Sequence, residues 1–454
     1  MALIDAGIKA PRFRAVTEAN VHRTPEWYRL DEDLREAVRV VSRVLPFRTN
    51  QYVIQSLINW SRVPEDPMFQ LTFPQAGMLH EEDYETIAGL MRAGASEESI
   101  GREVSRIRQE LNPHPAGQLT HNVPAWDDKP MRGLQHKYRE TVLFFPSHGQ
   151  TCHAYCTFCF RWAQFVGVDG LKFACRDPAV LVDYLRAHPN VTDVLFTGGD
   201  PLVMNTRNLR RYVEPLLDPA LDRVQNIRIG TKAPAYWPHR FVTDRDADDL
   251  LRLFEQVASS GRQLAIMAHL SHPVELSTDV AREALCRIRS TGAVVRTQGP
   301  LVRHVNNDPH VWAELWRTGV RLGVVPYYMF VERNTGAKEY FQVPLVRAWE
   351  VFQAAYQQVS GLARSVRGPC MSAFLGKVRI GGVTEMHGQR VFVLEYLQAR
   401  DPTLVRRPFF ARFDPQAVWF TGLVPATERD CEFFPDPGLL LGADEHHNPD
   451  RLSA

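Results

Sequence analysis

Residues 151–162 read TCHAYCTFCFRW and hold three of the chain's seven cysteines within eight positions, spaced C-x3-C-x2-C. The cysteines directly follow the apolar run TVLFF, which begins at Thr141. Four thiolates close a structural zinc site or an ordinary iron–sulfur cluster, whereas three leave one position of a metal centre open. The other cysteines are scattered along the chain, which argues against a disulfide framework. This stretch therefore predicts a metal centre or a catalytic site.

Two kinds of metal centre fit the three cysteines. A histidine could complete a structural zinc site of the Cys3His type, with His148 and His153 as candidates. Alternatively, an iron–sulfur cluster with one open iron could bind a small chelating ligand. Phe158 between the last two cysteines, and the position of the loop after a strand, favour the iron–sulfur cluster.

Residues 141–343 alternate short apolar runs with helical segments. The apolar runs begin near residues 141, 191, 224, 263, 292 and 321. Such alternation predicts parallel βα units with buried strands. Six units are too few for a closed eight-stranded barrel, so we expect a partial (β/α)6 barrel of the α/β class. Catalytic groups in such folds gather where strands end, which is where the cysteines lie.

The regions on either side of the barrel have other patterns. Residues 1–140 are predicted to form an N-terminal region of helices and loops, with helical periodicity at 31–44 and 81–108. Residues 344–454 are predicted to form a C-terminal α+β extension with an amphipathic helix, two strand-like pieces and a polar tail.

Composition limits the possible partners. The chain has 53 Lys and Arg against 52 Asp and Glu, so bulk charge favours neither nucleic acid nor an anionic membrane. No apolar run approaches the roughly 18 residues that a membrane span needs. The first residues lack the continuous apolar segment of a secretory signal. We therefore expect a soluble, cytoplasmic protein that binds no nucleic acid and no membrane.

A second motif ends the next apolar run. The stretch LFTGGDPL, residues 195–202, places Gly198, Gly199 and Asp200 after the second predicted strand. Two glycines let the backbone approach a ligand closely, and a carboxylate there can accept hydrogen bonds from an ammonium group. A GGD sequence by itself is most often a simple turn.

The pattern Cys152-x3-Cys156-x-Phe158-Cys159 resembles the cluster loop of radical S-adenosylmethionine enzymes. In that family the three thiolates hold a 4Fe-4S cluster, whose open iron binds S-adenosylmethionine. One electron then cleaves the sulfonium to give a 5′-deoxyadenosyl radical. The segment 198–200 resembles the family's motif for the methionyl amino group. The resemblance implies both cofactors and a one-electron donor such as flavodoxin or ferredoxin.

Longer segments resemble the lysine 2,3-aminomutase branch of that family over most of the chain. They are LPFR (45–48), VPEDPMFQLTFP (63–74), HKYRETVLFF (136–145), IRIGTKAPAYWPHR (227–240), HLSHPVE (269–275) and VVPYYMF (324–330). The branch uses pyridoxal phosphate together with the adenosyl radical to move an amino group. The resemblance therefore implies an isomerase that acts on an amino acid.

The resemblance also implies roles for three residues. Lys377 in SAFLGKVRI matches the lysine that carries pyridoxal phosphate, although only Gly376 precedes it where the branch has a glycine run. The alternative is an exposed lysine that opens a strand. Tyr138 matches a tyrosine that stacks on the cofactor ring, and a buried core tyrosine is the alternative. Arg161 matches the arginine that clamps the substrate carboxylate, and it could instead only neutralise the metal cluster.

Four further residues are weaker candidates. His269 and His272 match the branch's His-x-x-His-Pro, where we expect hydrogen bonding within the active site rather than metal binding. Gln298 and Arg303 follow the fifth predicted strand and could contact a ligand.

The substrate pattern departs from that of the lysine-specific enzymes. Those members hold the distant ammonium with two aspartates, and the matching positions here are Arg333 and Cys370. An arginine repels a lysine ammonium and pairs with an anionic end group, so Arg333 predicts that free lysine is not the substrate. A shift of one residue would instead place Glu332 in the site and restore a site for a cation.

Three functions are carried forward. The leading one is a radical aminomutase, which we expect to be a homo-oligomer like many of its relatives. The second is a pyridoxal-independent radical epimerase, dehydratase or other hydrogen-abstracting enzyme. The third is a zinc-stabilised binding protein without catalysis.

Overall fold

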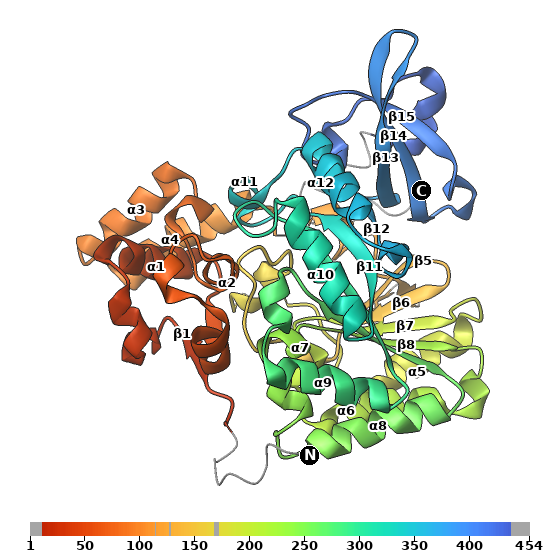
Figure 1. The fold of residues 1–454 in the computed structure, drawn as a ribbon, viewed down its shortest axis with the longest axis horizontal. Coiled ribbons are helices and arrows are strands. Elements are labelled where there is room, and N and C mark those ends of the chain that lie inside the picture. The colour runs from red at the N-terminus through yellow and green to blue at the C-terminus, as the bar shows by residue number, and fades with distance from the viewer. Residues whose placement is uncertain (1–10, 114, 127–128, 168–171, 437–454) are drawn as a thin grey trace.

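The computed structural model describes residues 11–113, 115–126, 129–167 and 172–436. Its centre is an 11-stranded sheet in the order β15-β14-β13-β12-β11-β10-β9-β8-β7-β6-β5 (Figure 1). Six consecutive strands run parallel: β6 (Thr141–Phe144), β7 (Asp193–Phe196), β8 (Asn226–Thr231), β9 (Gln263–His269), β10 (Val294–Leu301) and β11 (Val324–Val331). They fall on the six predicted apolar runs, which confirms the α/β class and the partial barrel.

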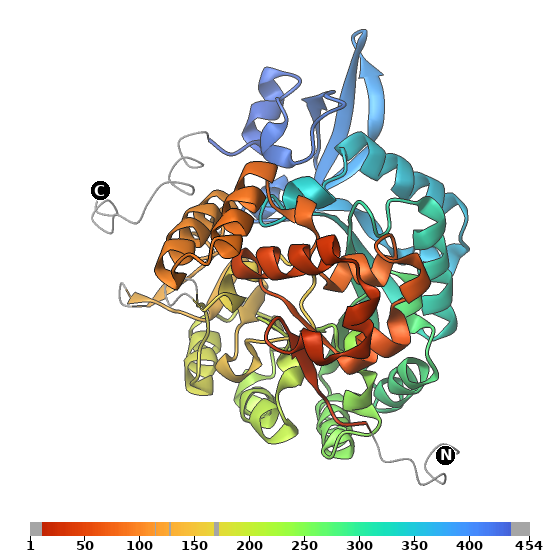
Figure 2. The ribbon, with the colours of Figure 1, turned by 90° about the vertical axis from the view of Figure 1, so that its left-hand side faces the viewer.

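Helices surround the parallel strands (Figure 2). They are α5 (Pro178–Ala187), α6 (Thr206–Val213), α8 (Ala247–Ser259), α9 (Asp279–Ser290), α10 (Pro309–Arg321) and α12 (Leu345–Gln357). Along β8, Ile227 and Ile229 are fully buried in the core, while Arg228 and Gly230 alternate with them and are partly exposed. Since neighbouring side chains on a strand point to opposite faces, Arg228 and Gly230 face the inside of the barrel.

A seventh parallel strand, β12 (Arg367–Ser372), extends the sheet beyond β11. The pattern RGPCMS does not predict it, because Gly368 and Pro369 are poor strand residues. Three antiparallel strands follow: β13 (Gly376–Met386), β14 (Gln389–Ala399) and β15 (Pro408–Arg412). The two predicted strand-like pieces of the extension are thus β13 and β14. The predicted polar tail lies largely outside the described residues.

At the other edge, β5 (Leu134–Tyr138) pairs antiparallel with β6 and lies against β14. The ammonium of Lys137 on β5 also donates to the carbonyl of Ala373, between β12 and β13. The sheet therefore curves so that its edge strand β5 meets the segment between β12 and β13, and Lys137 lies where they meet. β5 belongs to the predicted N-terminal region and β12 to the predicted C-terminal extension, yet both are part of the central sheet. The predicted region boundaries at residues 140 and 343 therefore stay predictions.

The N-terminal region packs over one end of the barrel (Figure 2). It contains α1 (Glu32–Val44), α2 (Pro67–Thr72), α3 (Glu81–Arg92), α4 (Glu97–Glu110) and a small antiparallel pair of β1 (Ala15–Thr17) with β2 (Arg48–Asn50). The helix predicted at 31–44 is α1. The stretch predicted at 81–108 is divided into two helices, because the chain turns at Gly94, whose φ is 64°. Among the described residues, no helix has the length and apolar character needed to cross a membrane.

Candidate functional site

The three-cysteine loop follows β6 and is held in place by the N-terminal region. The backbone N–H of Tyr155 donates to the carbonyl of Arg48 at 2.7 Å, and that of Thr157 donates to the carbonyl of Leu71 at 3.0 Å. The Thr157 hydroxyl also donates to the carbonyl of Gln70 at 2.7 Å. Segments 45–48 and 63–74 therefore form the support of the loop, which gives these quoted stretches a structural role.

Cys152, Cys156 and Cys159 are free thiols that lie close together. Burial raises the pKa of all three, and the charges of Cys159 and Cys156 add to this effect at Cys152. The backbone N–H of Cys159 donates to the carbonyl of Cys156 at 3.0 Å, which fixes the tight turn between them. Iron in a 4Fe-4S cluster binds deprotonated thiols, so the loop fits a cluster whose charge compensates the thiolates.

The two histidines that were candidates for a zinc site make other contacts in the described part of the chain. His148 shares a hydrogen bond of 2.9 Å with the Tyr212 hydroxyl, and the ring of His153 packs edge-on against Phe13. Across the described ranges, no three His, Cys, Asp or Glu side chains converge on one metal position. A cubane cluster needs no such convergence, because each thiolate binds a different iron.

The GGD turn touches the backbone of the cysteine loop. The N–H of Asp200 donates to the carbonyl of Thr151 at 2.7 Å. A Cβ on Gly199 would lie 2.4 Å from that carbonyl oxygen, and Gly198 has a φ of 138°. Both glycines are therefore required by the close approach of the second strand end to the residue that precedes Cys152.

Replacing Gly199 with alanine is expected to displace the cysteine loop. Overpacking against fixed backbone costs about 1–3 kcal/mol, so the melting temperature should fall and reconstituted protein should retain less iron. Gly101, in the middle of α4 with no atom within 4 Å of its added Cβ, gives the matched control Gly101→Ala. Iron content and thermal unfolding measure both variants. A Gly199→Ala protein with full iron content would contradict this role of the turn.

Asp200 links the GGD turn to the end of β8. Its carboxylate accepts from the Thr231 hydroxyl at 2.7 and 2.9 Å, from the N–H of Lys232 at 2.8 Å and from the N–H of Leu202 at 2.9 Å. Burial raises the pKa of Asp200, and these donors oppose the rise. The structure thus shows a carboxylate that joins two strand ends, and its contact with an amino group of a cofactor stays a prediction.

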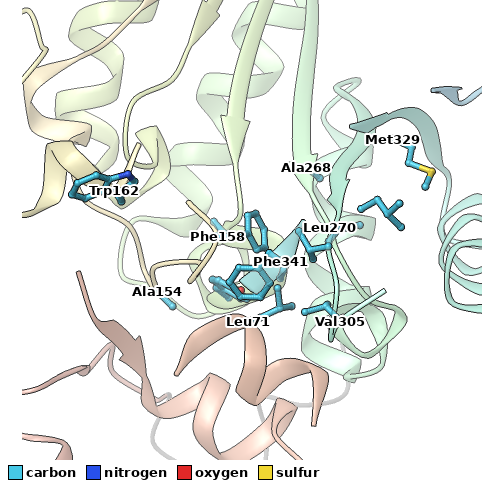
Figure 3. Close-up of a cluster of buried hydrophobic side chains, with 14 of the residues drawn as sticks. Leu71, Ala154, Phe158, Trp162, Ala268, Leu270, Val305, Met329 and Phe341 are labelled. Carbon is cyan, nitrogen blue, oxygen red and sulfur yellow. The ribbon is translucent and has the colours of Figure 1, made fainter. Parts of the chain in front are cut away.

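Phe158 belongs to an apolar cluster between the cysteine loop and the ends of β9 to β11. Its ring lies 6.1 Å from Phe341 and 5.9 Å from His269, measured between centroids. Figure 3 shows Phe158 and Phe341 beside Leu270 and Leu71. The aromatic ring between the last two cysteines therefore anchors the loop to the barrel.

The two histidines of the His-x-x-His-Pro segment have separate environments. Burial lowers the pKa of His269 well below its usual range, with Lys232 adding to the effect, so its ring is neutral. The Nδ1 atom of His272 accepts from the N–H of Val274 at 3.3 Å and caps the turn that follows. Within the described part of the chain, neither histidine belongs to a group of three possible metal ligands.

A buried ion pair beside Cys156 was missed by sequence reasoning. The ammonium of Lys232 pairs with the carboxylate of Glu275, donates to the carbonyl of His269 at 3.2 Å and lies 4.4 Å from the centre of the Tyr236 ring. The Tyr236 hydroxyl is 3.7 Å from the sulfur of Cys156. The sequence indicated these two residues only because segments 227–240 and 269–275, which contain them, resemble the lysine 2,3-aminomutase branch.

Arg161 and Arg333 stack on the same ring, and neither has an anionic partner among the described residues. Their guanidinium carbons lie 4.8 and 4.4 Å from the centre of Phe160, and Arg161 also lies 4.4 Å from the centre of Phe145. Neither side chain makes a hydrogen bond or ion pair to a described residue, and Nη1 of Arg161 is buried without a partner. Burial, with smaller effects of neighbouring charges, lowers the pKa of Arg161 to about 9 and that of Arg333 to about 10.

These two arginines belong to a larger group of cations, which we call the basic cluster: Lys137, Arg161, Arg333, Lys377 and Arg400. Burial lowers the pKa of Lys137 well below its usual range, and the charges of Arg333, Arg400 and Lys377 lower it further. Tyr138 lies within reach of Arg333, Arg400 and Cys370, and burial raises its pKa. Lys137, Lys377 and Arg400 each donate to a protein oxygen, so the unused donors that can bind an anionic ligand are those of Arg161 and Arg333.

Lys377 opens β13, as the alternative interpretation expected, but it is not exposed. Its ammonium lies 3.9 Å from the centre of the Tyr328 ring and donates to the amide oxygen of Gln398 at 3.3 Å. Burial lowers the pKa of Lys377 to about 7. A Cβ on Gly376 would lie 2.3 Å from the carbonyl oxygen of Gln398, so this single glycine suffices to let β13 approach β14.

Glu332 and Arg333 have different surroundings. Arg333 joins the basic cluster, whereas Glu332 is buried with neither carboxylate oxygen hydrogen-bonded, and Arg303 is the charge that acts on its pKa. Burial raises the pKa of Glu332 well above its usual range. Cys370 is fully buried, and its thiol donates to the carbonyl of Met329 at 3.5 Å. The structure thus places Arg333, and not Glu332, among the cations around Lys377.

The remaining candidates contribute less to the site. Gln298 lies beside Tyr328 in the register of β10 and β11, and its carbonyl accepts from the N–H of Leu270. Arg303 is exposed, and its guanidinium donates to the carbonyl of Gln342.

The chain is similar in sequence to known aminomutases. It is 32% identical over 392 residues to a protein of Aquifex aeolicus (strain VF5) that bears the provisional name L-lysine 2,3-aminomutase, covering 86% of this chain and 91% of that protein. It is 28% identical to the L-lysine 2,3-aminomutase of Clostridium subterminale over 56% of each chain. A radical SAM methyltransferase structure from Sphaerobacter thermophilus aligns over 62% of this chain and 91% of that chain, at 15% identity and a TM-score of 0.37. No family model matches the chain.

Proposed function

Because the chain belongs to the lysine 2,3-aminomutase family of radical S-adenosylmethionine enzymes, we propose that it moves the amino group of an amino acid other than free lysine. The observation that carries this proposal is the position of Arg161, which lies between the cysteine loop and the basic cluster around Lys377. It lies two residues after Cys159 and within the influence of the Cys159 and Cys152 charges, while it stacks on the same ring as Arg333. Arg161 therefore places the basic cluster directly beside the cysteine loop, where the radical would form.

The cysteine loop is the place for the iron–sulfur cluster. Cys152, Cys156 and Cys159 would hold three irons of a 4Fe-4S cluster, with S-adenosylmethionine on the fourth. When bound, the cluster and S-adenosylmethionine together supply a 5′-deoxyadenosyl radical after one-electron reduction of the cluster. Phe158 anchors the loop, and the GGD turn at residues 198–200 keeps its first cysteine beside the end of β8. We propose flavodoxin or ferredoxin as the electron donor and a homo-oligomer as the assembly.

Lys377 is the residue that we propose to bind pyridoxal phosphate. An amine with a pKa of about 7 is largely uncharged just above neutral pH, which makes it a nucleophile for an aldehyde. Arg400 offers positive charge for the phosphate group, Lys137 offers a hydrogen-bond donor, and the Tyr138 ring lies beside them. When bound, this cofactor stabilises an unpaired electron next to the migrating nitrogen.

Arg161 is proposed to hold the α-carboxylate of the substrate. Its Nη1 atom is buried and unpaired, which costs free energy unless a ligand supplies an acceptor. The planar guanidinium matches a carboxylate with two parallel hydrogen bonds. Stacking on Phe145 and Phe160 fixes the orientation of that plane. The substrate would therefore lie between the cysteine loop and Lys377.

Arg333 is proposed to select the other end of the substrate. It replaces one of the carboxylates that lysine-specific relatives use, and Cys370 at the second position is neutral because burial raises its pKa to about 12. A lysine ammonium would meet the unpaired charge of Arg333 in a desolvated place, which is repulsive. An acidic end group would form a charge-assisted pair there, and a neutral one would avoid the repulsion.

We therefore expect glutamate or aspartate to be turned over better than lysine or arginine. Replacing Arg333 with glutamine should lower kcat/KM for the acidic substrate by about a hundredfold, from the roughly 2–3 kcal/mol of a lost charge-assisted hydrogen bond. Chromatographic detection of the 3-amino isomer measures this for glutamate, lysine and arginine. Because a 2,3-shift in aspartate regenerates aspartate, its turnover is measured by transfer of deuterium from its β-carbon to 5′-deoxyadenosine. Glu332→Gln serves as the neighbouring control and should change the preference little. Efficient lysine turnover that survives Arg333→Ala and is lost in Glu332→Ala would contradict the assignment.

A further inference from the structure

A buried tyrosine hydroxyl contacts one of the three sulfurs of the cysteine loop. Tyr236 ends the short helix α7 (Ala233–Tyr236), which follows β8, and its side chain is fully buried. Its hydroxyl lies 3.7 Å from the sulfur of Cys156, within the range of a hydrogen bond to sulfur. Among the described residues this hydroxyl makes no other hydrogen bond, and no other side chain hydrogen-bonds a sulfur of Cys152, Cys156 or Cys159. Because a buried tyrosine hydroxyl normally has a partner, the Cys156 sulfur is the partner that the fold provides.

Tyr236 is held in place through both its backbone and its ring. The side-chain amide of Asn50, on β2, donates to the carbonyl of Tyr236 at 2.9 Å and to the carbonyl of His153 at 3.1 Å. Asn50 is fully buried, so it ties α7 to the cysteine loop. On the ring, the Lys232 ammonium lies 4.4 Å from the centre and pairs with the buried Glu275. These contacts fix the hydroxyl beside Cys156.

The direction of this hydrogen bond follows from the chemistry of a thiolate ligand. A thiol can donate or accept a hydrogen bond, whereas a thiolate that binds iron has no proton and can only accept. The Tyr236 hydroxyl therefore donates to the Cys156 sulfur when the loop holds its cluster. A hydrogen bond to a charged acceptor is stronger than a neutral one, and the low dielectric of a buried site strengthens it further.

Such a donor affects the two oxidation states of the cluster differently. One-electron reduction adds a negative charge to the cluster, while the hydroxyl stays in place. The hydrogen bond then stabilises the reduced form more than the oxidised form, which raises the reduction potential. Hydrogen bonds to the sulfurs are among the factors that set the potentials of iron–sulfur clusters.

We propose that Tyr236 is a positioning residue for the iron–sulfur cluster, whose hydroxyl donates to the Cys156 thiolate and raises the reduction potential of the cluster. The inference rests on the proposed function, which assigns the cluster to the cysteine loop. It deepens that function by naming a residue outside the loop that makes the cluster easier to reduce. It depends neither on pyridoxal phosphate nor on the substrate.

The test is a redox titration of anaerobically reconstituted protein without S-adenosylmethionine, monitored by electron paramagnetic resonance. At a given potential, Tyr236→Phe should lower the ratio of reduced to oxidised cluster about tenfold, the scale of one lost charge-assisted hydrogen bond. For a one-electron couple this is a shift of about 59 mV to more negative potential. Tyr236→3-fluorotyrosine, whose hydroxyl is a stronger donor, should shift the potential in the opposite direction. Tyr396→Phe is the matched control, because Tyr396 is equally buried and its hydroxyl donates to the carbonyl of Phe433 at 2.6 Å.

The iron content of each variant is measured before its titration. If Tyr236→Phe binds less iron than the wild type, the fluorotyrosine variant, which keeps the hydroxyl, decides the role of Tyr236. An unchanged potential in Tyr236→Phe with full iron content, or a negative shift in the fluorotyrosine variant, would overturn the inference and leave the cluster at the cysteine loop intact. A wild-type protein that binds no iron after reconstitution would instead refute the cysteine loop as the cluster site, and the inference with it.

Discussion

Cys156→Ala protein is expected to show no reductive cleavage of S-adenosylmethionine. With two thiolates left, the loop cannot hold three irons and keep the fourth open for the cofactor. The same loss is expected for Cys152→Ala and Cys159→Ala, since the three partly buried thiols lie within the influence of each other's charges. The measurement is the amount of 5′-deoxyadenosine formed under dithionite by anaerobically reconstituted protein, beside its iron content.

The other cysteines provide the controls. Cys286 and Cys431 are exposed, and the thiol of Cys175 donates to the carbonyl of Asp177, away from the loop. Replacing any of the three should leave iron content and cleavage largely unchanged. If a Cys175→Ala, Cys431→Ala double variant lost the cluster while Cys156→Ala kept it, the assignment of the loop would be wrong.

Lys377→Ala protein is expected to lose covalent attachment of pyridoxal phosphate and to lose aminomutase turnover by about 10³-fold or more, as for removal of an activated nucleophile. Borohydride reduction followed by peptide mass mapping should place the label on Lys377 in the wild type. Lys129→Ala, an exposed lysine far along the chain, is the control and should keep the label. The reductive cleavage of S-adenosylmethionine should continue in both variants, because the cysteine loop is intact.

The pH dependence of this attachment follows from the burial of Lys377. Its pKa is lowered to about 7, so the amine is mostly protonated at pH 6 and mostly free at pH 8. The rate of attachment should therefore rise through pH 7 and level off above pH 8, whereas an exposed lysine would still gain reactivity up to pH 10. A label on Lys137, or no label on protein with a full cluster, would favour the pyridoxal-independent radical enzyme.

The barrel could be predicted from sequence because its strands are short, apolar and separated by amphipathic helices. β12 could not be predicted from sequence, because its residues do not favour a strand and it forms one by pairing with β11. Gly368 lets β12 approach β11 so closely that an added Cβ would lie 2.5 Å from the carbonyl oxygen of Met329. Such an approach depends on the position of β11, which no local pattern of RGPCMS records.

The site was predictable where a motif or a resemblance marked it, and not where distant residues meet. The cysteine spacing and Arg333 are visible in the sequence, and the structure adds that Arg333 shares the ring of Phe160 with Arg161. The pairing of Lys232 with Glu275 requires two neighbouring strand ends separated by 43 residues. The burial that lowers the pKa of Lys377 likewise comes from the surrounding strands and not from its own segment.

The central claim is that a radical formed at the cysteine loop acts on an amino acid held beside Lys377. The most direct measurement uses reconstituted enzyme with S-adenosylmethionine, pyridoxal phosphate, dithionite and glutamate deuterated at its β-carbon. We expect deuterium in the recovered 5′-deoxyadenosine and the 3-amino isomer of glutamate among the products. Cleavage of S-adenosylmethionine without deuterium transfer from β-deuterated glutamate, aspartate, lysine or arginine, and without a 3-amino product from glutamate, lysine or arginine, would contradict the claim.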